Sequence, residues 1–102
     1  MTSEELSQIT QLQRDIQVLT EEMRNELKRL AAYAERADSL AVASVAYRVR
    51  QVAQRHGMVV IQEGASRIEE SARRNNVAQF TSDIKLLDHQ VRWYSQTAPQ
   101  PF

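Results

Sequence analysis

The chain has no cysteine, and its 102 residues include only two glycines and two prolines, none of them within the first 56 residues. Without cysteine, disulfide bonds, thiolate catalysis and cysteine-ligated zinc sites are excluded, and a reducing compartment is favoured. Because the turns of small sheets draw heavily on glycine and proline, their scarcity disfavours β-structure. The abundant glutamine, glutamate, arginine, alanine and leucine instead favour an all-helical protein.

The sequence also lacks a long apolar run and an excess of charge of either sign. No stretch approaches the roughly 20 apolar residues that span a bilayer, and the polar, acidic start MTSEELSQ is unlike a secretory signal. We therefore expect a cytoplasmic protein with no membrane partner. The 13 basic and 13 acidic residues cancel, whereas nucleic-acid-binding domains are usually strongly basic, so no nucleic-acid partner is expected.

The charges are nevertheless unevenly placed along the chain. Residues 1–38 carry eight acids and five bases, whereas residues 39–57 carry Arg48, Arg50 and Arg55 and no acid. This asymmetry indicates a local anionic partner for the second of these segments.

Hydrophobic periodicity predicts a single helical domain at residues 1–96, followed by a flexible tail at 97–102. The predicted helices span about residues 3–37, 40–56, 60–74 and 76–95. Their boundaries are marked by capping and helix-ending residues, which are Thr2 with Glu5, Asp38-Ser39, Gly57 and Asn75-Asn76. Short connections between four helices predict an up-down-up-down four-helix bundle with an extended N-terminal helix.

Each predicted helix carries one apolar stripe for the core. On the first helix the stripe is Ile9, Leu12, Ile16, Leu19, Met23, Leu30 and Tyr33, with Leu27 beside it and Glu26 within it. On the second it is Val42, Val45, Val49 and Val52, with Ala46 and Ala53 alongside. On the third it is Ile61, Ala65, Ile68 and Ala72, where Gly64 would allow a close helix approach. On the fourth it is Val77, Phe80, Ile84, Leu87, Val91 and Tyr94.

Catalytic and metal-binding patterns are missing. The two histidines, His56 and His89, fall on different helices, and the sequence contains no HExxH or GxSxG motif. Nearly all acids project outward, Asp83 and Asp88 among them, which disfavours a metal site inside the bundle. We expect no cofactor and no metal, and we expect Trp93 to be a packing residue.

The outward face of the second helix is the strongest candidate for a function. Since the valines point inward, a residue two positions from Val45 lies about 200° around the helix, so Tyr47 points away from the core. The candidate partner-binding residues are Tyr47, Arg48, Arg50, Gln51, Gln54 and Arg55. A solvated surface whose arginines serve only solubility is the alternative interpretation.

This stretch resembles the histidine-containing phosphotransfer (HPt) domains, the four-helix carriers of bacterial phosphorelays. The family pattern around the phosphorylated histidine is close to A-H-x-L-K-G, with a glycine ten positions after the histidine. The matching run is Ala46-Tyr47-Arg48-Val49-Arg50-Gln51, and Gly57 lies ten positions after Tyr47. The resemblance extends over about residues 23–94, and it implies an HPt-like bundle that docks against a receiver domain or a histidine kinase.

The departures from the family pattern change the expected function. Tyr47 stands at the phosphoacceptor position, Arg50 replaces the family's lysine, and Gln51 replaces the glycine that lets a receiver approach. Relay chemistry needs an imidazole nitrogen as nucleophile. A phenol with a pKa near ~10 forms a far more stable ester and cannot substitute for it. The resemblance therefore implies a non-catalytic signalling module, not an enzyme.

Two other functions remain open from the sequence. The long first helix could pair with another chain, which would make the protein a structural or oligomerisation bundle acting as an adaptor, either monomeric or homodimeric. An active phosphotransfer protein would have to use His56 or His89. His56 is expected to be a partly buried packing or capping residue, about 13.5 Å along the helix from Tyr47, and His89 to lie on the outer side of the last helix.

Overall fold

The computed structural model describes residues 2–97, apart from the side chains at positions 12, 13, 16 and 95–97. The tail predicted at 97–102 lies outside the described residues except for Thr97, which ends the last helix. Within these residues the chain forms four helices, α1 (Ser3–Glu35), α2 (Ser39–Arg55), α3 (Val59–Arg73) and α4 (Val77–Thr97). Against the predicted spans, α1 ends two residues earlier and α4 ends two residues later.

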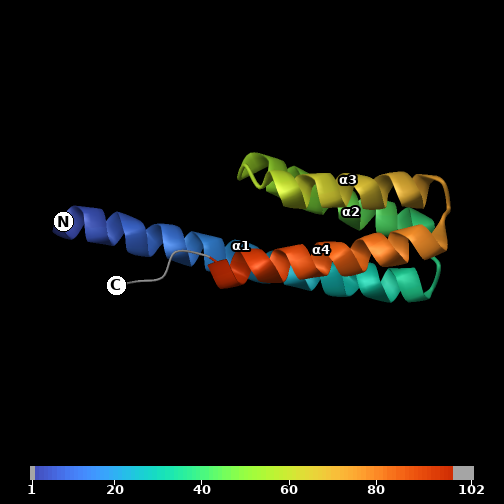
Figure 1. Ribbon diagram of the computed structural model, residues 1–102, viewed down its shortest axis with the longest axis horizontal. Coiled ribbons are helices and arrows are strands. Elements are labelled where there is room, and N and C mark those ends of the chain that lie inside the picture. The colour runs from blue at the N-terminus through green and yellow to red at the C-terminus, as the bar shows by residue number, and fades with distance from the viewer. Residues whose placement is uncertain (1, 98–102) are drawn as a thin grey trace.

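The four helices pack as a bundle, which confirms the predicted all-helical fold class. Each helix contacts the one before it, and α4 returns to pack against α1 (Figure 1). The bundle is elongated, with extents of 53 × 19 × 16 Å. None of the helices within residues 2–97 combines the length and the apolar character that crossing a membrane requires.

Three of the four helices begin at a side-chain cap, whereas Met58 at the start of α3 makes no capping hydrogen bond with its side chain. Thr2 accepts a hydrogen bond from the Glu5 amide at 3.2 Å, and the Glu5 carboxylate accepts one from the Thr2 amide at 3.1 Å, so the predicted capping box is confirmed. Asp38 accepts from the Ala41 amide at 3.1 Å and caps α2. Asn76 accepts from the Gln79 amide at 3.1 Å. These bonds satisfy amide groups that have no partner within their own helix.

Each turn between helices passes through one residue with a left-handed backbone. The residues are Ala37 (φ 54°), Gly57 (φ 66°) and Asn75 (φ 56°). Glycine adopts this conformation without a Cβ penalty, and asparagine tolerates it better than most residues. The prediction for Gly57 is therefore confirmed, whereas Ala37 holds a conformation that its side chain disfavours.

From Leu19 onward the core follows the predicted stripes with a few corrections, whereas Ile9 is only half-buried and the predicted Leu12 and Ile16 lie outside the described side chains. Leu27, predicted beside the stripe, is buried in the core, and Glu26, predicted within it, is only half-buried. Val77 and Trp93 were predicted to pack, but Val77 lies at the exposed start of α4 and Trp93 is 58% exposed. Small rotations of a helix about its axis decide such flanking positions, and neighbouring helices fix those rotations.

Gly64 lies on the side of α3 that packs closely against Leu87 and Gln90 of α4. A Cβ added to Gly64 would lie 2.9 Å from Leu87 Cδ1 and 3.1 Å from Gln90 Oε1. Both distances are too short for a side chain to be accommodated without movement. The prediction that Gly64 allows a close helix approach is therefore confirmed.

Candidate functional site

Helix α2 presents Tyr47 to solvent at its centre. Val42, Val45 and Val49 are buried on the opposite side, so the valine spacing holds Tyr47 outward as predicted. Tyr47 is 51% exposed, which is unusual for an aromatic residue in the middle of a helix. We call the surface formed by Tyr47, Arg48, Arg50, Gln51, Gln54 and Arg55 the docking face.

The residues of the docking face differ in exposure. Tyr47, Arg48, Gln54 and Arg55 are exposed, whereas Arg50 and Gln51 are half-buried. All six stand on one continuous stretch of α2, which lies between α1 and α3 in the bundle (Figure 1). The predicted partner-binding residues therefore share one surface, and its rims are supplied by the two neighbouring helices.

Arg50 connects Tyr47 to α3. Its Nε donates a hydrogen bond to Glu69 Oε2, and its Nη2 donates to Glu69 Oε1 at 3.4 Å. The guanidinium carbon also lies 5.1 Å from the centre of the Tyr47 ring, within the range of a cation–π contact. The hydrogen bond to Glu69 raises the pKa of Arg50, because it favours the charged form of the guanidinium.

Arg48 is held on the other side of the docking face by α1. Its Nη2 lies 3.3 Å from Glu26 Oε2, and the same carboxylate receives Arg29 from one turn along α1 at 2.9 Å. The two arginines and the glutamate form a small network on the surface. Such exposed pairs contribute little stability, but they direct the side chains that take part.

The docking face is less positive than the sequence suggests. Residues 39–57 contain no acid, yet Glu26 from α1 and Glu69 from α3 approach Arg48 and Arg50 directly. Among the described residues Arg55 makes no ion pair. The expectation of an acid-free arginine surface is therefore wrong for the folded protein, because residues distant in the sequence neutralise two of its three cations.

Both histidines lie at exposed positions on the surface. His56 directly follows the last residue of α2 as its C-cap, which is one of the two predicted roles, but it is exposed and not partly buried. The helix stops at Arg55, so the helical spacing that placed His56 over the core no longer applies to it. His89 is exposed on α4, as predicted.

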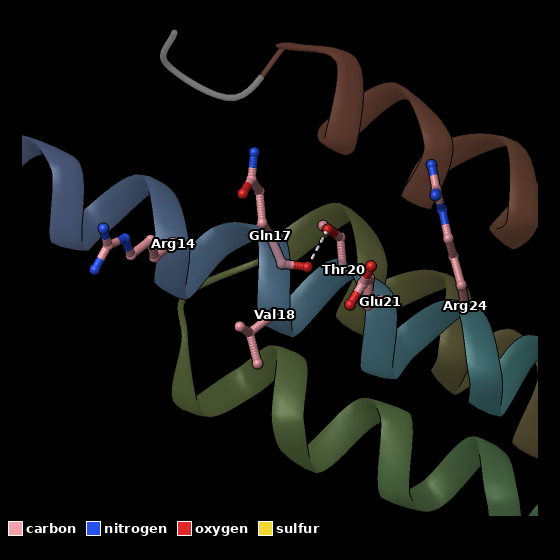
Figure 2. A pocket seen from close by; sticks show the side chains of 6 residues that line it. All are labelled: Arg14, Gln17, Val18, Thr20, Glu21 and Arg24. Atoms are coloured by element: carbon pink, nitrogen blue, oxygen red, sulfur yellow. Dashed lines mark hydrogen bonds between the residues drawn. The ribbon is translucent and has the colours of Figure 1, made fainter. Parts of the chain in front are cut away.

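The part of the chain that the structure describes gathers no set of three or more metal-binding side chains. Six residues of α1 line a shallow groove, which Figure 2 shows from close by. Gln17 and Val18 point to different sides of the helix. The Thr20 hydroxyl donates a hydrogen bond to the Gln17 carbonyl. Because these side chains come from a single helix and diverge, they do not bring reactive groups together.

Sequence reasoning missed three residues that shape the docking face. Glu69 and Glu26 were not singled out as partners, although each directly adjoins the buried stripe of its own helix. Leu40 is 84% exposed. It lies seven residues, about 10.5 Å, before Tyr47 on the same side of α2. The seven-residue spacing of Leu40 and Tyr47 is visible in the sequence and could have identified Leu40.

Comparisons of the chain with protein-family models, with curated proteins and with solved structures gave no match. The side chains of the docking face define what this surface can bind or react with. An exposed aromatic ring fixed by a charged neighbour, with amide and guanidinium groups around it, is suited to binding another protein. The same side chains include no imidazole, thiol or free carboxylate that could act as a nucleophile.

Proposed function

We propose that this protein is an HPt-like signalling module that binds a response-regulator receiver domain or a histidine kinase through the docking face without carrying phosphate. The observation that carries the proposal is the position of Tyr47, which is 51% exposed at the centre of α2. In the resembling family this position presents the phosphorylated histidine. A tyrosine there keeps an exposed anchor for a partner and removes the relay chemistry.

The arrangement of Arg50 supports a binding role for Tyr47. The ring is flanked by a guanidinium that Glu69 holds in place from α3. A side chain fixed before binding loses less conformational freedom when a partner arrives. Tyr47 therefore has the features of an aromatic interface anchor, which are exposure, a rigid position and polar neighbours.

Charge contributes less to holding an acidic receiver pocket against the docking face than its three arginines suggest. Glu69 and Glu26 already neutralise Arg50 and Arg48. Arg55 is the cation of the face that remains available to an acidic group of the partner. We expect Tyr47 to supply affinity and Arg55 to accelerate association at low ionic strength.

The proposal is tested with purified receiver domains from the organism's response regulators, in free form and with the beryllofluoride adduct that mimics phosphorylation. Isothermal titration should detect binding by at least one receiver. Tyr47→Ala should weaken that binding about tenfold or more. The matched control is Leu86→Ala, because Leu86 is 47% exposed on α4, which packs against α1 and α3, and it should leave the binding unchanged.

Three results would contradict this function. The first is that no receiver or kinase domain binds, and the second is that Tyr47→Ala and Arg55→Ala both bind as well as the unaltered protein. The third is an acid-labile phosphate on His56 or His89 after incubation with a phosphorylated receiver, since it would make the protein an active carrier. Arg50→Ala is a poor probe, because it also leaves the half-buried Glu69 without its partner.

The length of α1 favours a second candidate function, a structural or adaptor bundle that assembles with another chain. The helix has 33 residues, whereas α2 has 17 and α3 has 15. Even α4, which has 21 residues, can accompany only about two-thirds of α1, so the remainder of α1 lies beyond the other helices.

A further inference from the structure

A groove of about 290 Å³ runs along the boundary between α1 and α2. Its apolar lining is formed by Met23 and Val49, which are buried, and by Val52, which is half-buried. Binding sites for small molecules usually have volumes of about 300–1,000 Å³. The α1–α2 groove lies at the lower limit of this range, so it is suited to one or two side chains of a protein partner.

The rim of the groove carries two arginines that share one carboxylate. Arg29 Nη1 lies 2.9 Å from Glu26 Oε1, and Arg48 Nη2 lies 3.3 Å from Glu26 Oε2. Glu26 can cancel only one of these two charges, so the cluster keeps one positive charge, which Arg29 adds from outside the docking face. The side chains of Arg29 and Arg48 are 59% and 54% exposed. The positive charge that remains is therefore open to solvent.

Both arginines have donors left for a second carboxylate. A guanidinium carries five N–H donors in a planar fork, and each arginine uses one terminal nitrogen for its hydrogen bond to Glu26. The two oxygens of Glu26 already bridge the two groups. A second carboxylate has the same size and geometry, so it can bridge them from the solvent side.

The charge of the cluster matches a carboxylate better than a phosphate group. One additional carboxylate brings the cluster of Glu26, Arg29 and Arg48 to neutrality. A phosphorylated side chain carries about −1.5 to −2 charges at neutral pH. It would leave negative charge next to Glu26, where the two anions repel each other. Aspartate and glutamate are therefore the side chains that this cluster favours.

The groove also has a direction. In Figure 1, α2 returns alongside α1 in the opposite direction. Val52 follows Arg48 by one turn of α2, so it lies level with Glu22, which precedes Glu26 by one turn of α1. Glu22 is exposed and repels an acid at this end of the groove. An acidic side chain therefore fits beside the arginines, and an apolar one fits on Val52, about 6 Å along the groove.

We propose that the α1–α2 groove binds an acidic side chain of a protein partner, with an apolar side chain of the same partner seated on Val52. A separation of about 6 Å corresponds to four positions of a helix or two positions of an extended segment. Arg48 belongs to both the groove and the docking face, so the groove extends that face toward α1. The inference concerns the groove alone and holds whichever class of partner the docking face binds.

Selection of a displayed library of random peptides on the full chain tests this assignment. The recovered peptides should share an acidic residue and a large apolar residue at one of these two spacings. Synthetic copies of the recovered peptides are then titrated with the full chain and its variants, with fluorescence polarisation as the readout. Arg29→Gln and Arg48→Gln should each weaken binding about fivefold, which is the upper end for an ion pair that stays exposed to water.

Lys28→Gln is the matched control. Lys28 is exposed next to Arg29 in the sequence, but it points about 100° away from it around α1 and does not line the groove. Its replacement removes the same charge as Arg29→Gln and should leave peptide binding unchanged. Equal weakening by the two variants would overturn the assignment, because it would show that only the overall charge of the chain matters.

Two other results would overturn the inference. One is a selection that recovers no peptide, or only peptides without an acidic residue. The other is displacement of the peptides by inorganic phosphate at a lower concentration than by acetate at equal ionic strength, since the cluster would then prefer phosphate to a carboxylate. No receiver domain is present in these measurements, so a failure here is distinguishable from a failure of the proposed function.

Discussion

Replacing Gly64 by alanine should show how closely α3 and α4 pack. The added Cβ would lie 2.9 Å from Leu87 Cδ1, and Leu87 is fully buried, so its side chain has little room to move. Overpacking of this kind typically costs about 1–3 kcal/mol. Alanine is favoured over glycine inside a helix by about 1 kcal/mol. We therefore expect Gly64→Ala to reduce the free energy of unfolding by about 1 kcal/mol.

The opposing contributions are separated by removing the side chain that the new Cβ meets. Leu87→Ala alone should cost about 2–5 kcal/mol, because it leaves a cavity in the core. In that background the contact with Cδ1 is gone, so Gly64→Ala should become stabilising by up to about 1 kcal/mol. The contact with Gln90 Oε1, a buried oxygen without a hydrogen-bond partner, remains and limits the gain. The expected coupling energy is about 2 kcal/mol.

The four proteins of this cycle can be compared by urea denaturation followed by far-UV circular dichroism. Linear extrapolation with a common slope gives each free energy of unfolding. If Gly64→Ala has the same effect with and without Leu87, within about 0.5 kcal/mol, the two positions are independent. That outcome would refute the close approach of α3 to α4 at Gly64.

The remaining predictions concern the turns and the docking face. Gly57→Ala should destabilise the protein by about 1 kcal/mol through its left-handed backbone alone, because the space around Gly57 is open. Ala37→Gly should stabilise it by about 0.5–1 kcal/mol for the same reason. If thermal unfolding shows that Gly57→Ala and Ala37→Gly shift the Tm in the same direction, this explanation is contradicted. Glu69→Ala should release Arg50, which NMR would detect as faster solvent exchange of the Arg50 Nε proton; an unchanged rate would argue against the hydrogen bond to Glu69.

Local signals in the sequence were sufficient for the helices and their ends. The capping box of Thr2 and Glu5, the Asp38 cap and the left-handed Gly57 depend on residues within one turn of each other. The exposed position of Tyr47 follows equally from the spacing of the valines on its own helix. These features are decided by the backbone geometry of a single helix, so they do not require knowledge of its neighbours.

The errors of the sequence reasoning lie at the borders of the apolar stripes and at the ends of helices. Leu27 and Glu26 are adjacent in the sequence, and only the packing of α2 and α4 against α1 decides which of them is buried. Val77 and His56 lie where a helix starts or stops, so the periodicity that held for the helix interior did not hold for them.

The sequence by itself determined an all-helical chain, its turns and an outward Tyr47, because propensity, capping and periodicity act over a few residues. Only the tertiary structure decided the electrostatics of the docking face. Glu69 lies 19 positions from Arg50, and Glu26 lies 22 positions from Arg48. Their meeting depends on which helices are neighbours and on how each is rotated, and no local pattern specifies either.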